Sequence, residues 1–277
     1  MADQTDVDWP RRGLGGTIAL YFRLQLVHLR ASVEYRGDFW IGILGATLYQ
    51  FSYLVFLVVF FSHVDQIAGW TLWQVAMLFG LAGLPRGLVE MLGDGSWALK
   101  HMVNTGTFDR VLVRPLSPAI QTISSLGGIH GLGQAIPGLV LIVLGASLGG
   151  VTWTPGLVLF LIVTLVASTF LLAALTLGVN MVCFWEPSAR SQIPIMYLML
   201  VDFAKFPLDI FNRFIQVLVT VLAPFAFVSY FPALILFDKP SSWQWLGYLT
   251  PVVAGLVVAG VARLWGVALR RYQGVGH

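Results

Sequence analysis

Charge is scarce in this 277-residue sequence: 10% of the residues are Asp, Glu, Lys or Arg, whereas 57% are hydrophobic. A soluble domain carries about 25% charged residues, so this chain cannot keep its apolar surface away from water. The sequence contains one cysteine, Cys183, which excludes a disulfide framework within the chain and a zinc site built from several cysteines. It also contains no Gly-Lys pair, so the lysine-bearing phosphate loop of ATPases is missing.

The basic residues do not indicate a polynucleotide partner. The net charge is only +3, and the distribution of lysines and arginines is typical of membrane orientation and not of a nucleic-acid patch. The histidines are scattered, with no cysteine or carboxylate partner at a metal-ligand spacing. We therefore predict no nucleic-acid binding, no metal site and no catalytic residues.

Long apolar runs dominate what the sequence does contain, and several reach the length needed to cross about 30 Å of hydrocarbon as a helix. We predict an all-α membrane protein with one transmembrane domain at 39–271. Its six transmembrane helices are expected at 39–61, 71–92, 119–148, 156–185, 192–212 and 245–269. Residues 213–236, which contain Pro224 and Pro232, are expected to form a re-entrant hairpin before the last span.

The two ends of the chain are predicted to lie in the cytoplasm. Residues 1–38 include an apolar stripe from Ile18 to Val33, which predicts an amphipathic helix in the membrane interface. The link between the first two spans has no Lys or Arg, whereas Arg270 and Arg271 follow the last span and precede the tail at 272–277. Positive charge favours the cytoplasmic side, and with both termini inside the number of crossings must be even.

A polar segment between the second and third spans is predicted to form two short helices, the first ending at Gly106 and the second before Pro115. Within it, residues 104–118 read NTGTFDRVLVRPLSP, and residues 224–232 later read PFAFVSYFP. These stretches resemble the type-2 ATP-binding-cassette permeases, especially their six-span exporter branch. The resemblance extends over nearly the whole chain.

The resemblance implies that the polar segment carries a coupling helix, which docks in a groove of a separate cytoplasmic ATPase. The implied coupling residues are Gly106, Asp109, Arg110, Leu112, Arg114 and Leu116. It also implies that ATP and Mg bind to that ATPase and no cofactor to this chain, and that a second permease, identical or related, completes the assembly in the plasma membrane. From the residues alone, arginines that merely fix topology explain the segment equally well.

Charged residues inside the predicted spans are candidates for the transport pathway. Arg86 and Glu90 are four residues apart and can neutralise each other on a helix, and Asp94 continues the row. A second stripe forms if a helix continues through Pro207, and its members are Asp202, Lys205, Asp209 and Arg213. We expect this stripe near the outer interface. Such charges are costly in a membrane and often functional, although structural ion pairs explain them as well.

The function expected from these observations is ATP-driven export of a hydrophobic or amphipathic substrate, such as a drug or a lipid, by alternating access. Two alternatives remain. An ion-gradient-driven secondary transporter would have repeated halves, and the sequence has no convincing repeat. An intramembrane serine hydrolase would need a nucleophile and a base, for which Ser147 or Ser168 and His130 are available.

Overall fold

The computed structural model describes residues 15–16, 21–23, 25–26, 36–186 and 192–272. Within these residues the regular elements are helices, apart from one isolated bridge between Ile67 and Trp70. Most of the amphipathic helix expected at 18–33 lies outside the described residues, as does nearly all of the tail. The short described pieces near the N-terminus are helical, and Gln25 Nε2 donates a hydrogen bond to the Leu92 carbonyl at 2.6 Å.

Four helices are long and apolar enough to cross a membrane, judged by length and composition. They are α2 (Arg36–Phe61), α3 (Leu72–Gly93), α8 (Pro155–Asn180) and α12 (Thr250–Arg271). Short helices prolong three of them, so that the apolar stretches run over Trp40–Phe61, Leu72–Asn104, Pro155–Phe184 and Gln244–Arg271. These helices correspond to the first, second, fourth and sixth predicted spans.

The third and fifth predicted spans are interrupted. The third is divided into α6 (Pro118–Ile123), η3 (Ile129–Gly131) and α7 (Leu132–Leu148), and α7 has only 17 residues. The fifth contains α9 (Ile193–Val201) and η5 (Asp202–Lys205), after which the backbone becomes extended at Phe206. The following Pro207 disfavours a helical conformation in the residue before it. The charged stripe expected from Asp202 to Arg213 therefore does not lie on one helix.

The region of the expected hairpin is a bent pair of helices. Its first arm is α10 (Arg213–Val217) with η7 (Leu218–Leu222), and its second is η8 (Phe225–Phe227) with α11 (Tyr230–Leu236). The arms meet at 79° across the break before Phe225, a geometry that fits a broken span or a re-entrant loop. The described residues thus hold four candidate spans, or five if the bent pair is one span, and the count of six stays a prediction.

Glycines bring α3 and α7 into backbone contact. A Cβ atom on Gly80 would lie 2.7 Å from the carbonyl oxygen of Gly138, and one on Gly87 would lie 2.5 Å from the backbone nitrogen of Ala135. A Cβ atom on Gly145 would likewise lie 2.6 Å from the Cβ atom of Met77 and 2.7 Å from the carbonyl oxygen of Trp73. Only glycine permits such an approach, so these glycines allow α3 and α7 to pack closely within one chain.

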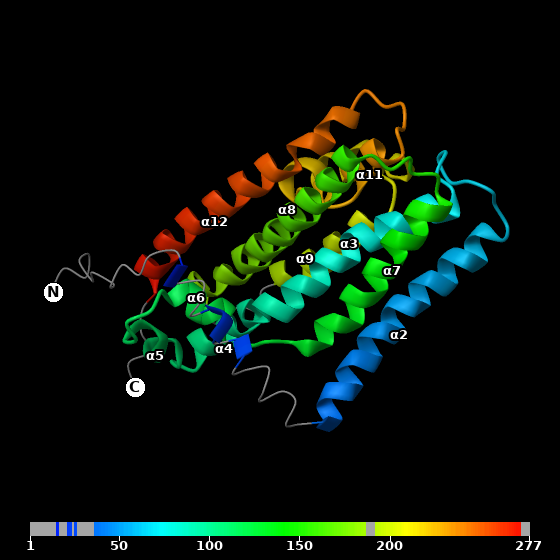
Figure 1. Cartoon of the computed structure of the whole chain (residues 1–277). Coiled ribbons are helices and arrows are strands. Elements are labelled where there is room, and N and C mark those ends of the chain that lie inside the picture. The colour runs from blue at the N-terminus through cyan, green and yellow to red at the C-terminus, as the bar shows by residue number, and fades with distance from the viewer. Residues whose placement is uncertain (1–14, 17–20, 24, 27–35, 187–191, 273–277) are drawn as a thin grey trace.

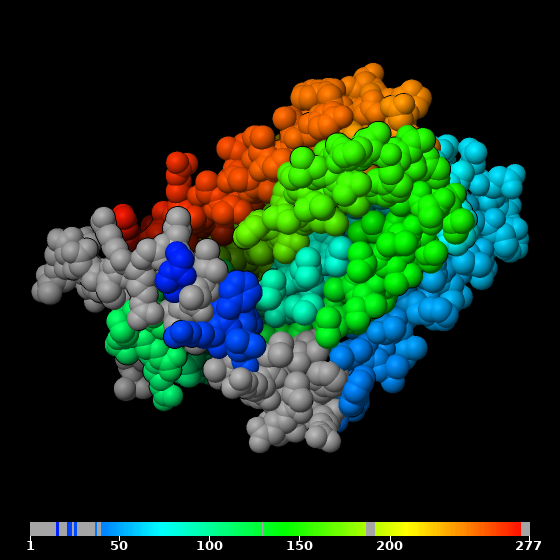
Figure 2. Space-filling view, in the orientation of Figure 1, coloured from blue at the N-terminus to red at the C-terminus, as the bar shows by residue number. Residues whose placement is uncertain are grey.

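The helices form an elongated bundle whose surface is largely apolar. Figure 1 shows α4, α5 and α6 gathered at one end, which we call the segment end, while the link from α2 to α3 lies at the opposite, link end. In Figure 2, α2 and α12 form the flanks on either side of α7 and α8. Large exposed side chains such as Leu44, Val143 and Leu256 cover these helices. A bilayer can solvate a surface of this kind, and water cannot.

Candidate functional site

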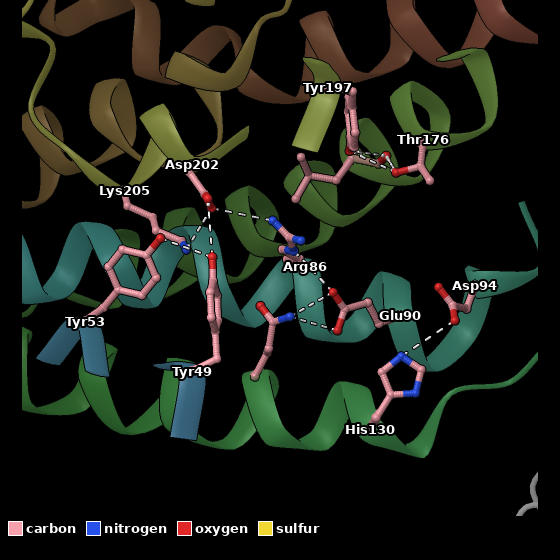
Figure 3. Close-up of polar contacts among 12 residues, drawn as sticks. Tyr49, Tyr53, Arg86, Glu90, Asp94, His130, Thr176, Tyr197, Asp202 and Lys205 are labelled. Atoms are coloured by element: carbon pink, nitrogen blue, oxygen red, sulfur yellow. Dashed lines mark hydrogen bonds and ion pairs between the residues drawn. The ribbon is translucent and has the colours of Figure 1, made fainter. Parts of the chain in front are cut away.

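Arg86 lies in an ionic network that joins α3 to η5. Its Nε atom is 3.2 Å from Glu90 Oε1, so the pair expected from the spacing is present, and its Nη1 atom is 3.7 Å from Asp202 Oδ1. Lys205 Nζ lies 2.8 Å from the same Asp202 oxygen, as an ion pair without the angles of a hydrogen bond. Figure 3 shows Asp202 between the two cations.

Two tyrosines of α2 complete the surroundings of Lys205, whose exposed fraction is 2%. The Lys205 ammonium lies 4.2 Å from the ring centroid of Tyr53 and 5.1 Å from that of Tyr49. The Tyr49 hydroxyl donates a hydrogen bond to Asp202 Oδ2 at 3.3 Å. Tyr49 is near the middle of α2, so Asp202 and Lys205 lie at mid-depth in the bundle. The prediction that places them near the outer interface is therefore wrong.

The network continues onto α7. Gln134 Nε2 donates to both carboxylate oxygens of Glu90, at 2.8 and 2.9 Å. Asp94, at the C-terminal end of α3, pairs with His130 Nε2 at 3.6 Å, so His130 is not the lone histidine that its sequence position suggests. Together these contacts surround Glu90 and Asp94 with polar groups from two helices (Figure 3).

A cavity of about 290 Å³ opens beside this network. One side is polar and includes Arg86, Glu90 and Asp94. The remaining lining residues come from α2, α3, η2 (Asp94–Ala98), η3, α7, α8 and α9, and they are Ala46, Val89, Trp97, His130, Gln134, Leu172, Thr176, Tyr197, Leu198 and Val201. The cavity therefore offers charged and apolar surfaces to the same ligand, which is the requirement for holding an amphipathic molecule.

Asp209 lies in a separate cluster at the link end of the bundle. It accepts hydrogen bonds from Trp70 Nε1 at 3.0 Å and from the Tyr230 hydroxyl at 2.9 Å. Lys239 lies 4.6 Å from the centroid of the Trp70 ring system and donates to the Gly69 carbonyl. Burial lowers the pKa of Lys239, and the nearby Asp209 carboxylate partly opposes that shift. Asp209 thus joins the α2–α3 link to the bent pair of helices. It does not belong to the network around Asp202.

The polar segment at the segment end has the two short helices expected from its sequence, α4 (Leu99–Asn104) and α5 (Phe108–Leu112). Gly106 separates them with a φ of +70°, in the left-handed region that favours glycine. The exposed side of the segment carries Asn104, Thr105, Asp109, Arg110, Val113, Arg114 and Pro115.

Two apolar side chains of the segment differ in position from their neighbour Val113. Leu112 packs against the buried cluster beneath the segment, and Leu116 is half-buried. Val113 is instead 83% exposed between the two arginines, and its sequence position alone did not single it out. Val113 therefore supplies an outward apolar side chain on the segment.

A family model described as ABC-2 family transporter protein matches residues 47–276. The chain belongs to the ABC-2 transporter family. Comparison with curated proteins and with solved structures finds no match. This ABC-2 protein is accordingly a multi-pass membrane permease with a transport function. Members of the family are membrane components, generally non-catalytic, that typically work with an ATPase subunit.

The two serines considered for hydrolase chemistry in this ABC-2 permease make backbone hydrogen bonds. Ser147 Oγ donates to the Val143 carbonyl at 2.8 Å, one turn earlier in the same helix, and Ser168 Oγ donates to the Val228 carbonyl at 3.3 Å. The Ser147 bond, to the preceding turn of its own helix, is common for hydroxyls inside membrane helices. His130 faces Asp94, so the arrangement does not favour the hydrolase alternative.

Proposed function

We propose that this permease is the membrane subunit of an ATP-driven exporter in the plasma membrane, paired with a second permease and with cytoplasmic ATPase subunits. Family membership supports this proposal, because proteins of the family act with an ATPase. The chain crosses the membrane six times, with α7 and the region around α9 as the short crossings and the bent pair as a re-entrant hairpin.

The segment end faces the cytoplasm. Arg110 and Arg114 lie on the segment, and Arg270 lies at the last turn of α12 near the same end. The α2–α3 link at the opposite end has no lysine or arginine. The positive-inside rule supports this orientation, with both termini in the cytoplasm.

The exposed side of the segment is the docking surface for the ATPase. Arg110 and Arg114 present two positive charges on the exposed side of the segment, which also carries the exposed Val113 side chain. A partner with an acidic rim around an apolar groove would complement this surface, since charges set register and a buried apolar anchor supplies affinity. Gly106, Leu112 and Leu116 shape the segment from within. ATP and Mg bind to the ATPase, and this chain binds no cofactor.

The cavity beside Arg86 and Glu90 receives the substrate, which we infer to be amphipathic. Its polar groups would contact a headgroup, while Val89 and Leu172 would contact an apolar portion. Exposed charges at mid-depth are too costly to face lipid, so a path completed by the second permease explains the 30% exposure of the Asp202 side chain. Alternating access would open this cavity to one side of the membrane at a time.

The observation that carries the proposal is a family permease whose exposed segment presents Arg110, Val113 and Arg114. The test reverses both arginines, Arg110→Glu and Arg114→Glu, and measures co-purification of the ATPase and ATP-dependent transport of an NBD-labelled phospholipid in proteoliposomes. We expect both to be lost while the detergent-solubilised permease keeps its yield. Arg270→Glu combined with Arg271→Glu makes the same charge change off the segment and should leave both intact. Retained co-purification by the double variant would contradict the docking surface.

A further inference from the structure

Four aromatic side chains meet beneath the segment, and we call them the aromatic clasp: Phe108 of α5, Phe184 of η4 (Met181–Phe184), Trp265 of α12, and Tyr272 directly after α12. The ring of Phe108 is 5.2 Å from Phe184 and 5.1 Å from Tyr272, measured between centroids. Phe184 is in turn 5.8 Å from Trp265. These contacts are edge-to-face, a geometry worth about 0.5–1.5 kcal/mol per pair beyond burial.

A hydrogen bond also joins α5 to the residue that follows α12. The Tyr272 hydroxyl donates to Asp109 Oδ1 at 2.8 Å, and Asp109 follows Phe108 in α5. Phe108 itself is fully buried among apolar side chains that include Leu99 and Met181. One turn of α5 is therefore held to the end of α12 by a buried ring and by a hydrogen bond to a carboxylate.

The segment follows α3 directly in the chain, and the aromatic clasp gives it a second connection, to α12. Helix α3 is locked to α7 by glycines, and side chains cannot be inserted there without moving backbone. An apolar cavity of about 280 Å³ lies instead among α6, α8 and α12, lined by Ala119, Ala173 and Trp265 among others. A displaced segment would thus meet less resistance along α12 than along α3, since empty space already exists there.

We propose that the aromatic clasp transmits displacement of the 94–117 segment to α12, with Asp109 and Tyr272 as positioning residues. This inference rests on the proposed function, in which an ATPase acts on the segment. It assigns the Asp109 carboxylate to contact within the permease, and leaves Arg110, Val113 and Arg114 to contact the ATPase. ATP-driven movement of the segment then pulls on the end of α12 and changes the packing of α12 against α8.

The test measures distances between spin labels by pulsed electron paramagnetic resonance in the complex of permease and co-purified ATPase. Labels are placed on exposed sites in a Cys183→Ala background, and labelled permease is diluted with unlabelled permease. The pair His101→Cys with Leu139→Cys follows the segment relative to α7, because His101 is an exposed residue of α4 that is not among the residues assigned to contact the ATPase. The pair Leu264→Cys with Leu139→Cys follows α12 relative to α7. Each pair is measured with and without ATP and vanadate.

We expect ATP to shift both distances in the parent. Tyr272→Ala should abolish the α12 shift and keep the segment shift, and Tyr272→Phe, which keeps the ring, should reduce the α12 shift less. Tyr248→Ala is the matched control, because Tyr248 packs on Phe160 near the other end of α12. An α12 shift that survives in Tyr272→Ala, or is missing in the parent while the segment moves, overturns the clasp alone. A segment that stays still with the ATPase bound overturns the coupling function as well.

Discussion

Replacement of Asp202 by Asn should destabilise the protein more than removal of the lysine that it neutralises. In Asp202→Asn, the buried Lys205 ammonium loses its counterion, and breaking a buried pair in this way costs about 3–5 kcal/mol. The faces of Tyr49 and Tyr53 lie beside the ammonium in the parent and in the variant alike, so their interaction with it does not change this difference. Because the Asp202 side chain is 30% exposed, we expect a smaller loss, of about 2 kcal/mol, in the free energy of unfolding.

In Lys205→Met, by contrast, Asp202 keeps Arg86 at 3.7 Å as a counterion, and a buried ion replaced by an apolar group of similar length costs about 1 kcal/mol or less. The double variant should therefore be more stable than Asp202→Asn alone. Thermal unfolding in detergent, followed by tryptophan fluorescence, measures the difference, which we expect to be on the order of 5 °C between Asp202→Asn and the parent. Equal losses from both single variants, or losses that add in the double variant, would refute the reasoning.

Two further outcomes are expected. Gly87→Val should remove the folded protein from detergent extracts, because even its Cβ would lie 2.5 Å from a backbone atom of α7. Gly255 on α12 faces open space, so Gly255→Val should be tolerated. Similar yields of folded protein from the two variants would contradict the α3–α7 packing. Burial, with Asp109 beside it, raises the pKa of Tyr272 to about 12. Folding thus favours the neutral phenol. The contribution of Tyr272 to the free energy of unfolding should be fully present below pH 10.0, its ordinary pKa, and should be lost as the pH rises through about 12. An ultraviolet titration of tyrosinate should show a tyrosine that ionises near pH 12 in the parent and is missing from Tyr272→Phe. Identical titration curves of the two proteins would contradict this.

Hydropathy predicted four spans well because their apolar length is continuous, but it did not predict the breaks in the helices of the third and fifth predicted spans. The third stretch is apolar enough, but the chain leaves the helix between α6 and α7, where Gly127 and Gly128 lie. The fifth stops at Phe206 because of the proline that follows it. Window averages count side chains and do not register such interruptions.

The site was predictable only where contacts are local. Arg86 and Glu90 are one helical turn apart, so their pairing follows from sequence spacing. Gln134 reaches Glu90 from α7, and Tyr49 reaches Asp202 from α2, so these contacts depend on how distant helices align. A polar amide inside an apolar run was the one available signal for Gln134.

The helical period of α5 would have predicted from the sequence which of its residues are buried. Phe108 and Leu112 are four residues apart and therefore share a helix face, which the structure buries. Asp109, Arg110 and Val113 lie on the exposed side. The resemblance grouped Leu112 with the charged residues as a docking element, whereas the period of the helix separates them.

The most direct test of the account is transport by the purified permease with and without its ATPase. The tagged chain is isolated in mild detergent, its co-purifying proteins are identified by mass spectrometry, and the preparation is reconstituted with NBD-labelled phospholipid. We predict that a nucleotide-hydrolysing subunit co-purifies and that movement of the probe needs both this subunit and ATP. Full transport by the isolated chain, with no such companion and no nucleotide, would contradict the central claim that its energy comes from another subunit.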